Sequence, residues 1–227
     1  MHSVELVHLT PDSESLIAQL ARVSNPSNQD NPDYVKLIRY LIKHKHWSPF
    51  EMVNMCLKIH TTRSIAAQIL RHRSFSFQEF SQRYAIVSPT PKLGTDNWLI
   101  PPLPLRRQDT SNRQSSIDDL DTDIVQKYQM EASKLYDQSF RLYKEMLDAG
   151  IAKECAREVL PLSTPTTIYM NGSIRSWLHY IDLRSANGTQ LEHQKIANEA
   201  KQVIHEHLPS ISQAMWPMNQ VGTDKYW

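Results

Sequence analysis

The chain has 227 residues, of which 40% are hydrophobic, and this suits one large domain with a real core, or at most two domains. Its 25 basic and 24 acidic residues give a formal net charge of +1. That balance disfavours a general nucleic-acid-binding protein, which usually carries a larger basic excess, so any anion-binding site must be local.

The N-terminal sequence, the length of the apolar runs and the cysteines predict the cellular compartment. The N-terminal stretch "MHSVELVHLT" is short and carries Glu5, and no apolar run approaches the roughly 18 residues of a membrane span. Cys56 and Cys155 have no metal-type or redox-type neighbour at close spacing, so we expect free thiols in a reducing compartment. We therefore expect a soluble, cytoplasmic protein.

Glycine is scarce, with only five residues, and these are scattered. Neither a dinucleotide-binding fingerprint nor a P-loop can be written with them, because both need clustered glycines for close backbone approach to phosphate. If the chain binds phosphate, side chains must do much of the work.

The first elements are short. Val4 to Leu9 predicts a strand. Thr10, followed by a proline, predicts the N-cap of a helix that runs to about Val23, and residues 25–32 predict a loop.

A helix, a strand and a second helix are expected next. Residues 33–47 predict a helix from the spacing of Val35, Ile38, Leu41 and Ile42, and Pro49 is expected to end it. Residues 50–62 alternate, which predicts a strand with one face made of Val53, Met55, Leu57 and Ile59 and the other of Asn54, Cys56, Lys58 and His60. Thr62 to Arg73 predicts a helix with Ile65, Ile69 and His72 on one side.

Helices dominate the second half. Residues 88–119 predict a long, mobile functional loop, because they are rich in Pro, Ser and Gln. A long helix is expected over Ile117–Ala149, ended by Gly150. Three further helices are expected over residues 152–160, Ser173–Asn187 and Leu191–Leu208. The fold class is therefore α+β or mixed α/β, a single domain over residues 1–227 with long helices around a small central sheet.

The densest cluster of polar and aromatic side chains is "RHRSFSFQEFSQRY", from Arg71 to Tyr84. Its arginines can make forked bonds to phosphate or carbonyl groups, its aromatic rings can stack, and Glu79 can accept a hydrogen bond. A helix end rich in salt bridges followed by a half-buried turn explains the same residues without a ligand. Gln68 and Arg71 are three residues apart and are neighbours on the expected helix.

A second cationic group lies far down the chain, where Arg157 precedes a helix that carries Arg175, His179 and Arg184. Arg175 and His179 share a face, whereas Arg184 lies about half a turn away at about 100° per residue. Such a helix serves two ligands, or a ligand and a subunit contact. The alternative is a surface ion pair between Arg175 and Asp182.

A metal site is not expected. His44 and His46 are two residues apart and His60 lies on the next strand, but no third ligand has a fitting spacing. His205 and His207 suit a solvated helix end. Ser81 has no evident base partner in the sequence, so no Ser-His-Asp arrangement is proposed.

Arg71-His72-Arg73, then seven residues, then Ser81-Gln82-Arg83-Tyr84 resembles the signature of the flavin-dependent thymidylate synthases. Further matches follow the family's order: "ARVS" from Ala21, "KHKHWSPFE" from Lys43, "AREVLP" from Ala156 and "HYIDLR" ending at Arg184. The chain departs from the family's pattern at Gln78, Gln82 and Ser173.

The resemblance implies an α+β subunit of a homotetramer with active sites at the subunit interfaces. It implies FAD as cofactor, dUMP as substrate, and 5,10-methylenetetrahydrofolate and NADPH as co-substrates. By the same resemblance, FAD contacts Ser48, Arg71, His72, Arg73, Glu79, Ser173, Arg175 and His179, with Ser24, His46 and Glu51 as weaker candidates. The residues that hold dUMP are Gln68, Arg71, Glu79, Ser81, Gln82, Arg83, Arg157 and Arg184.

The implied activity is a methyltransferase reaction without a cysteine nucleophile, because neither Cys56 nor Cys155 resembles an activated thiolate. Arg184 takes the catalytic role, since a cation beside uracil N3 favours the deprotonated ring and makes C5 nucleophilic. Three rivals remain open: an arginine and aromatic nucleic-acid-binding module, a flavoprotein of other chemistry such as a nicotinamide oxidase, and a purely structural oligomer.

Overall fold

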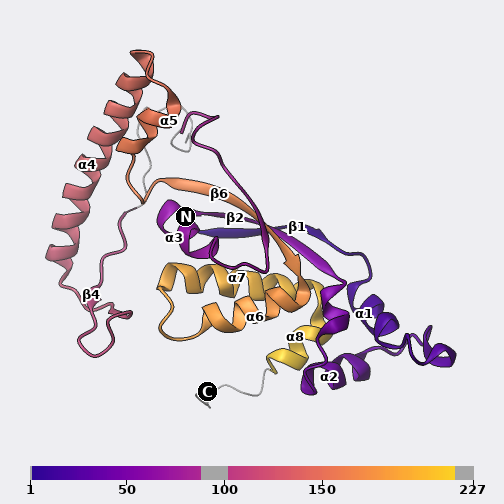
Figure 1. The fold of residues 1–227 in the computed structure, drawn as a ribbon. Coiled ribbons are helices and arrows are strands. Elements are labelled where there is room, and N and C mark those ends of the chain that lie inside the picture. The colour runs from indigo at the N-terminus through magenta and orange to yellow at the C-terminus, as the bar shows by residue number, and fades with distance from the viewer. Residues whose placement is uncertain (1, 88–101, 218–227) are drawn as a thin grey trace.

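A central antiparallel sheet organises the computed structural model, which describes residues 2–87 and 102–217. The strand order is β1 (Ser3–Leu9), β2 (Asn54–Thr62), β6 (Pro165–Ser173), β3 (Ser76–Glu79), and each strand is antiparallel to its neighbours (Figure 1). β2 and β6 pair along their whole length, from Asn54 opposite Ser173 to Thr62 opposite Pro165. This central pair fixes where both ends of β6 lie.

The core lies under one face of the sheet. Alternate residues of β2 are buried, as the sequence predicts for a strand with one apolar face. α6 (Ile174–Ser185) and α7 (Leu191–His207) cover this face, and α8 (Pro209–Met215) packs beside α7 and α2 (Val35–Lys43) (Figure 1). Trp177 and Tyr180 of α6 are fully buried in this core.

The N-terminal elements largely confirm the expectations. The predicted strand is β1, and the predicted helices are α1 (Ser13–Ala21) and α2 (Val35–Lys43). The N-cap is Asp12 and not Thr10, because Asp12 adopts a left-handed backbone with φ 49° that turns the chain into the helix. The loop over residues 25–32 contains a single 3-10 turn, η1 (Pro26–Asn28).

Two expectations about helix ends are wrong. Pro49 does not end a helix but lies in the first turn of the 3-10 helix η2 (Ser48–Glu51), where its missing N–H costs nothing. The helix expected over Thr62–Arg73 is α3 (Arg63–Ile69), and residues 71–73 lie in the turn after it. The chain leaves the helix early because β3 must start at Ser76 to pair with β6.

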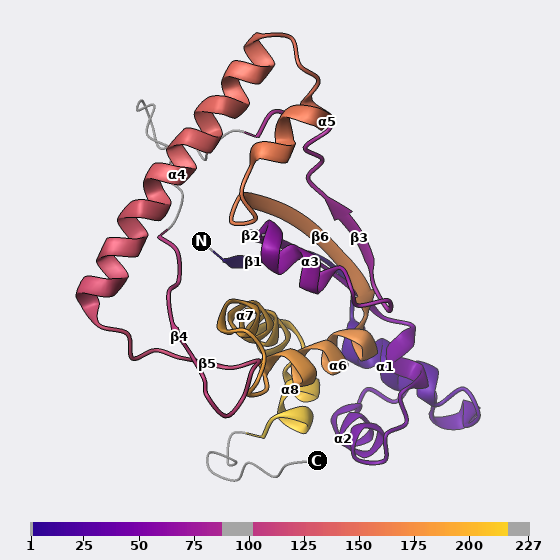
Figure 2. The same ribbon diagram turned by 60° about the vertical axis from the view of Figure 1, so that its left-hand side comes forward.

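Residues 102–164, with Val87 packed against them, form an arm along one side of the molecule (Figures 1 and 2). It contains a hairpin of β4 (Arg107–Gln108) and β5 (Ser116–Ile117), then α4 (Thr122–Asp148), α5 (Lys153–Ala156) and the 3-10 turn η3 (Arg157–Val159). The long helix ends as expected, before Gly150 with φ 84°. It begins later than expected, because Ser116 and Ile117 pair in the hairpin and Asp121 caps the helix by accepting from Asp123 N.

Of the predicted mobile loop, residues 88–101 lie outside the described residues, and residues 102–119 contain the hairpin. The arm has a small core of its own, made of Val87, Phe140, Tyr143 and Ala156. Within the described ranges, no helix combines the length and apolarity needed to cross a membrane. The predicted α+β class, with long helices around a small sheet, is confirmed.

Candidate active site

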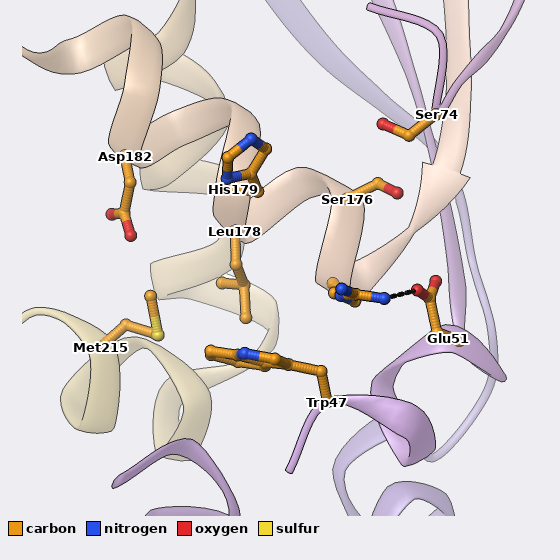
Figure 3. Close-up of a pocket in the computed structure, with 9 residues that line it drawn as sticks. Trp47, Glu51, Ser74, Ser176, Leu178, His179, Asp182 and Met215 are labelled. Carbon is orange, nitrogen blue, oxygen red and sulfur yellow. Dashed lines mark hydrogen bonds and ion pairs between the residues drawn. The ribbon is translucent and has the colours of Figure 1, made fainter. Parts of the chain in front are cut away.

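The face of α6 that carries Arg175 borders a pocket of about 400 Å³ (Figure 3). Arg175, His179 and Asp182 follow one another at helical spacing along this face and line the pocket. Trp47, Leu178 and Met215 supply its apolar wall, with Trp47 below Leu178 in the view shown. The pocket therefore offers an aromatic and aliphatic surface beside two basic side chains.

Glu51 organises the rim of this pocket. Its carboxylate accepts a hydrogen bond from Ser173 Oγ at 2.5 Å and from the Arg175 guanidinium at 2.6 Å. The bond from Ser173, more than the charge of Arg175, lowers the pKa of Glu51. Arg175 therefore pairs with Glu51, and the alternative pair with Asp182 is wrong, since Asp182 accepts from Trp216 Nε1.

Ser173 has two structural roles at this point. It is the N-cap of α6, where its Oγ accepts from Ser176 N, and it also donates to Glu51. A serine at this position therefore suits the local fold. Three other residues predicted to contact FAD, Ser24, His46 and Ser48, are exposed.

The opposite face of α6 carries Arg184, as the half-turn offset predicts. Its Nε donates to His72 Nε2 over 2.9 Å, across 112 residues of sequence. Burial, reinforced by the charge of Arg184, lowers the pKa of His72 to about 4, so this imidazole is neutral and accepts the bond. The two terminal nitrogens of Arg184 have no hydrogen-bond partner among residues 2–87 and 102–217.

His193 lies behind this pair and was missed by the sequence analysis. It is fully buried, its Nε2 lies 3.1 Å from Tyr180 Oη, and its Nδ1 lies 3.2 Å from Gln68 Oε1. Burial, with the nearby charge of Arg184, lowers the pKa of His193 to about 3. The burial of His193 can be predicted from the sequence, because His193 continues the stripe of buried α7 residues formed by Ile196, Ala197, Ala200 and Ile204.

The Glu79 carboxylate accepts hydrogen bonds from two side chains of the same chain. It accepts from Arg63 Nη1 at 2.5 Å and from Thr166 Oγ1 at 3.0 Å. Arg63 was also missed, and the sequence carries no signal for it, since the contact depends on β3 pairing with β6 beside the start of α3.

Arg83 and Arg157 meet at the base of the arm. Arg83 pairs with the Glu154 carboxylate at 3.0 Å, and Arg157 Nε donates to the Glu154 carbonyl oxygen at 3.3 Å. The neighbouring Gln82 is 7% exposed, and its Nε2 has no partner in the described part of the chain. Arg71, Arg73 and Ser81 are exposed.

The chain does not bring all predicted substrate residues together. Arg157 lies in η3, before β6, and shares Glu154 with Arg83, whereas Arg184 lies near the end of α6, after β6, and bonds to His72. These contacts place the predicted substrate residues in two separate groups within the described part of the chain.

The histidines considered for a metal are spread over different contacts. His60 Nδ1 lies 2.9 Å from Thr167 Oγ1, whereas His44 packs its ring against Tyr40. Within the described ranges, no three His, Cys, Asp or Glu side chains are grouped so that they could hold a metal ion.

Comparisons with known proteins cover nearly the whole chain. A family model described as "Thymidylate synthase complementing protein" matches residues 5–210. A probable flavin-dependent thymidylate synthase of Paramecium bursaria Chlorella virus 1 is 54% identical over 204 residues, which is 89% of this chain and 90% of the relative. A flavin-dependent thymidylate synthase of Synechocystis sp. is 48% identical over 202 residues, 89% of each chain.

A solved structure has the same fold. The UMP/dUMP methylase PolB from Streptomyces cacaoi, bound with 5-Br dUMP, superposes with a TM-score of 0.78 at 28% identity and covers 94% of each chain. The motifs, the fold and these matches agree, and the chain belongs to the family of flavin-dependent thymidylate synthases.

Proposed function

We propose that this chain catalyses the reductive methylation of dUMP to dTMP, with 5,10-methylenetetrahydrofolate as the one-carbon donor, NADPH as the reductant and FAD as the flavin. The observation that carries this proposal is Arg184, whose Nε is held by neutral His72 while its terminal nitrogens have no hydrogen-bond partner in the described part of the chain. Such a guanidinium can bind the flat carbonyl and N3 edge of a pyrimidine with two parallel bonds.

The role of Arg184 follows from electrostatics. A cation fixed beside N3 lowers the pKa of that N–H and stabilises the deprotonated ring, whose charge spreads to C5. C5 then becomes nucleophilic without a covalent enzyme adduct. Because His72 is neutral, it holds Arg184 in place without competing for the negative charge.

The cysteines support this route. Burial raises the pKa of the Cys56 thiol, which is the opposite of what an attacking thiolate needs. Cys155 is exposed on α5, whereas Arg184 lies on α6.

The pocket of Figure 3 fits part of a flavin nucleotide, since it combines a Trp47 ring and aliphatic side chains with the Arg175 guanidinium and the His179 imidazole. The residues proposed to hold FAD are Ser48, Arg71, His72, Arg73, Glu79, Ser173, Arg175 and His179. A bound flavin supplies the hydride chemistry that side chains cannot perform. Since His72 Nε2 accepts from Arg184, its Nδ1 is the atom left for a cofactor contact.

The residues proposed to hold dUMP are Gln68, Arg71, Glu79, Ser81, Gln82, Arg83, Arg157 and Arg184. The unpartnered Gln82 amide supports this assignment, because a buried N–H without an acceptor is costly unless a ligand satisfies it. Arg157 and Arg184 belong to different groups of contacts, with Glu154 and with His72, which suits a site built from more than one chain, and we propose a homotetramer.

The visible spectrum of the purified protein with FAD, before and after addition of dUMP, tests this function first. We expect oxidised-flavin bands that shift with dUMP, and dTMP as the product when both co-substrates are added. UMP is the matched control, because the PolB relative is described as a UMP/dUMP methylase. A colourless protein that ignores dUMP, or flavin turnover with no change at C5, would contradict the proposal.

A further inference from the structure

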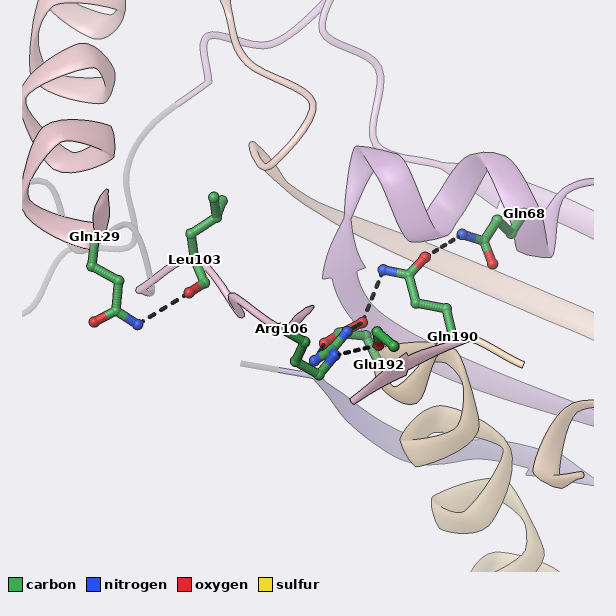
Figure 4. A network of polar contacts seen from close by, with 7 residues as sticks. Gln68, Leu103, Arg106, Gln129, Gln190 and Glu192 are labelled. Atoms are coloured by element: carbon green, nitrogen blue, oxygen red, sulfur yellow. Dashed lines mark hydrogen bonds and ion pairs between the residues drawn. The ribbon is translucent and has the colours of Figure 1, made fainter. Parts of the chain in front are cut away.

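A continuous hydrogen-bonded path runs from the core to the arm. From the core outward, Tyr180 Oη lies 3.1 Å from His193 Nε2, and His193 Nδ1 lies 3.2 Å from Gln68 Oε1. Gln68 Nε2 donates to Gln190 Oε1 at 2.7 Å, and Gln190 Nε2 donates to the Glu192 carboxylate at 2.8 Å (Figure 4). The path joins the consecutive helices α6 and α7 to α3, which is distant from them in sequence.

The far end of the path is strongly anchored. Arg106 makes two parallel bonds to the Glu192 carboxylate, at 2.6 and 2.9 Å, and its Nε donates to Ser116 Oγ (Figure 4). The two charged side chains are only 14% and 11% exposed. Burial alone would raise the pKa of Glu192, but the bonds from Arg106 and Gln190 outweigh it and lower that pKa, so the carboxylate is ionised.

The ionised carboxylate sets the direction of every other bond in the path. Because it can only accept, Gln190 must present its amide nitrogen to Glu192 and its oxygen to Gln68. Gln68 must therefore donate from Nε2 to Gln190 and turn its own oxygen to His193. His193 then carries its proton on Nδ1 and accepts from the Tyr180 hydroxyl at Nε2.

This polarity matters because an amide side chain can turn over and exchange its donor for its acceptor. The path leaves Gln68 in one orientation, with one N–H and one oxygen lone pair free for a ligand. The same cluster also lies next to His72, which accepts the hydrogen bond from Arg184. The centroids of the His72 and His193 rings lie 6.3 Å apart, and both rings lie beside Tyr180.

We propose that His193 is a positioning residue for dUMP binding, which acts through Gln68 by fixing its amide orientation, with Gln190, Glu192 and Arg106 as the outer anchor. This inference rests on the proposed function, in which Gln68 contacts dUMP. It adds residues from α7 and the arm to the machinery of the site.

The test compares His193→Leu, which removes the donor to Gln68, with His193→Asn, which keeps an N–H near Nδ1. Both are measured in the FAD-loaded full chain, as the dissociation constant for dUMP and as kcat and KM separately. We expect His193→Leu to weaken dUMP binding about tenfold, which is about 1.4 kcal/mol, with a higher KM and little change in kcat. His193→Asn should restore most of the affinity.

Gln190→Ala provides a second, exposed position that can be changed without disturbing the core. It should weaken dUMP binding severalfold, whereas Gln194→Ala should not. Gln194 is the matched control, because it lies on the same helix but donates to the Ala186 carbonyl oxygen, outside the path.

A double-mutant cycle with Gln68→Ala decides the interpretation. If His193 acts through Gln68, then His193→Leu and Gln190→Ala cost nothing further once Gln68 is alanine. Additive losses, equal losses for His193→Leu and His193→Asn, or full dUMP affinity in Gln68→Ala would each overturn the inference while the proposed function stands. A parent protein that does not bind dUMP would overturn both.

Discussion

Arg184 and His72 form the pair on which the chemistry depends. Replacing Arg184 with alanine removes the cation and leaves His72 without its donor, while α6 keeps its buried residues Trp177 and Tyr180. We expect a folded, flavin-binding variant whose kcat falls by at least about 10²–10³. Turnover of dUMP with stopped-flow flavin spectra checks this, with Arg107→Ala as the control because Arg107 pairs with Asp119 at the surface. Methylation at near the parent rate would show that Arg184 does not activate the ring.

The two cysteines provide the opposite test. The double variant Cys56→Ala/Cys155→Ala should retain most of the activity, because burial raises the pKa of the Cys56 thiol and Cys155 is exposed. The methylation rate at saturating dUMP is the measurement. Loss of all turnover in a stably folded variant would revive a thiolate mechanism.

The two neutral histidines make stability depend on pH. Burial, with Arg184 and His179 nearby, lowers the pKa of His72 from an ordinary 6.5 to about 4, and burial, with Arg184 and His72 nearby, lowers that of His193 to about 3. Below about pH 6.5 the two histidines are protonated in the unfolded chain but stay neutral in the folded chain, so the unfolded state binds more protons. Their contribution to the free energy of unfolding is therefore complete above about pH 6.5 and is lost as the pH falls. We expect the urea midpoint to drop less between about pH 7 and about pH 5 in His193→Asn than in the parent. His205→Asn, with an exposed ring, should keep the parent's slope; equal slopes in all three proteins would contradict the assigned neutrality.

At the scale of elements, β6 and the turn before β3 meet at Gly172. A Cβ added there would lie 2.5 Å from Cδ1 of Phe75, whose ring also packs against Trp177. Gly172→Ala should therefore lower the free energy of unfolding by about 1–3 kcal/mol and displace the turn that carries His72. Urea unfolding measures the first effect, and Gly172→Ala/Phe75→Leu should cost less than the sum of the single changes. A stability like that of the exposed-site control Ser76→Ala would mean that the ring moves aside freely.

The sequence predicted most of the elements whose signal is local, with β6 as the exception, and missed β3, whose signal is not local. The helices α2 and α7 and the strand β2 carry clear periodicity, and all three lie where it places them. β3 has only four residues, and its edges are fixed by pairing with β6, so no local pattern marks it. β6 does alternate, since Thr166, Ile168 and Met170 are buried and the residues between them are not. This pattern is typical of a strand, but the sequence analysis does not predict one there.

The same limit applies to the site. Residues on one helix face could be grouped from spacing, as with Arg175 and His179, which line one pocket. Contacts across the fold could not, which is why Arg63 and the partner of Arg184 emerge only from the structure. The resemblance supplied the residue roles that spacing alone left open.

At the scale of the whole molecule, the arm leaves an apolar surface uncovered. Ile124, Tyr128, Leu135 and Leu142 are exposed on α4, and their spacing of four, seven and seven residues places them on one face of the helix. An exposed stripe of this kind favours association with another chain. It supports the proposed homotetramer, whose mass in light scattering would be four times the 26.3 kDa of the chain.

Subunit mixing tests where the active site is built. Arg157 shares Glu154 with Arg83, whereas Arg184 bonds to His72, and from this division we propose that one dUMP contacts Arg157 of one chain and Arg184 of another. Arg157→Ala and Arg184→Ala should each be nearly inactive alone. Coexpressed with different affinity tags and purified through both, they should regain activity, because some sites then receive both arginines.

The control for mixing is the double variant Arg157→Ala/Arg184→Ala coexpressed with the wild-type chain. If sites combine two chains, each site loses one arginine wherever its two contributors differ, and activity falls below the wild-type share of the protein. If one chain supplied both arginines, the mixed single variants would stay inactive, and wild-type activity would simply scale with its share. The complementation outcome therefore separates a shared site from a site within each chain, independently of how tightly the subunits associate.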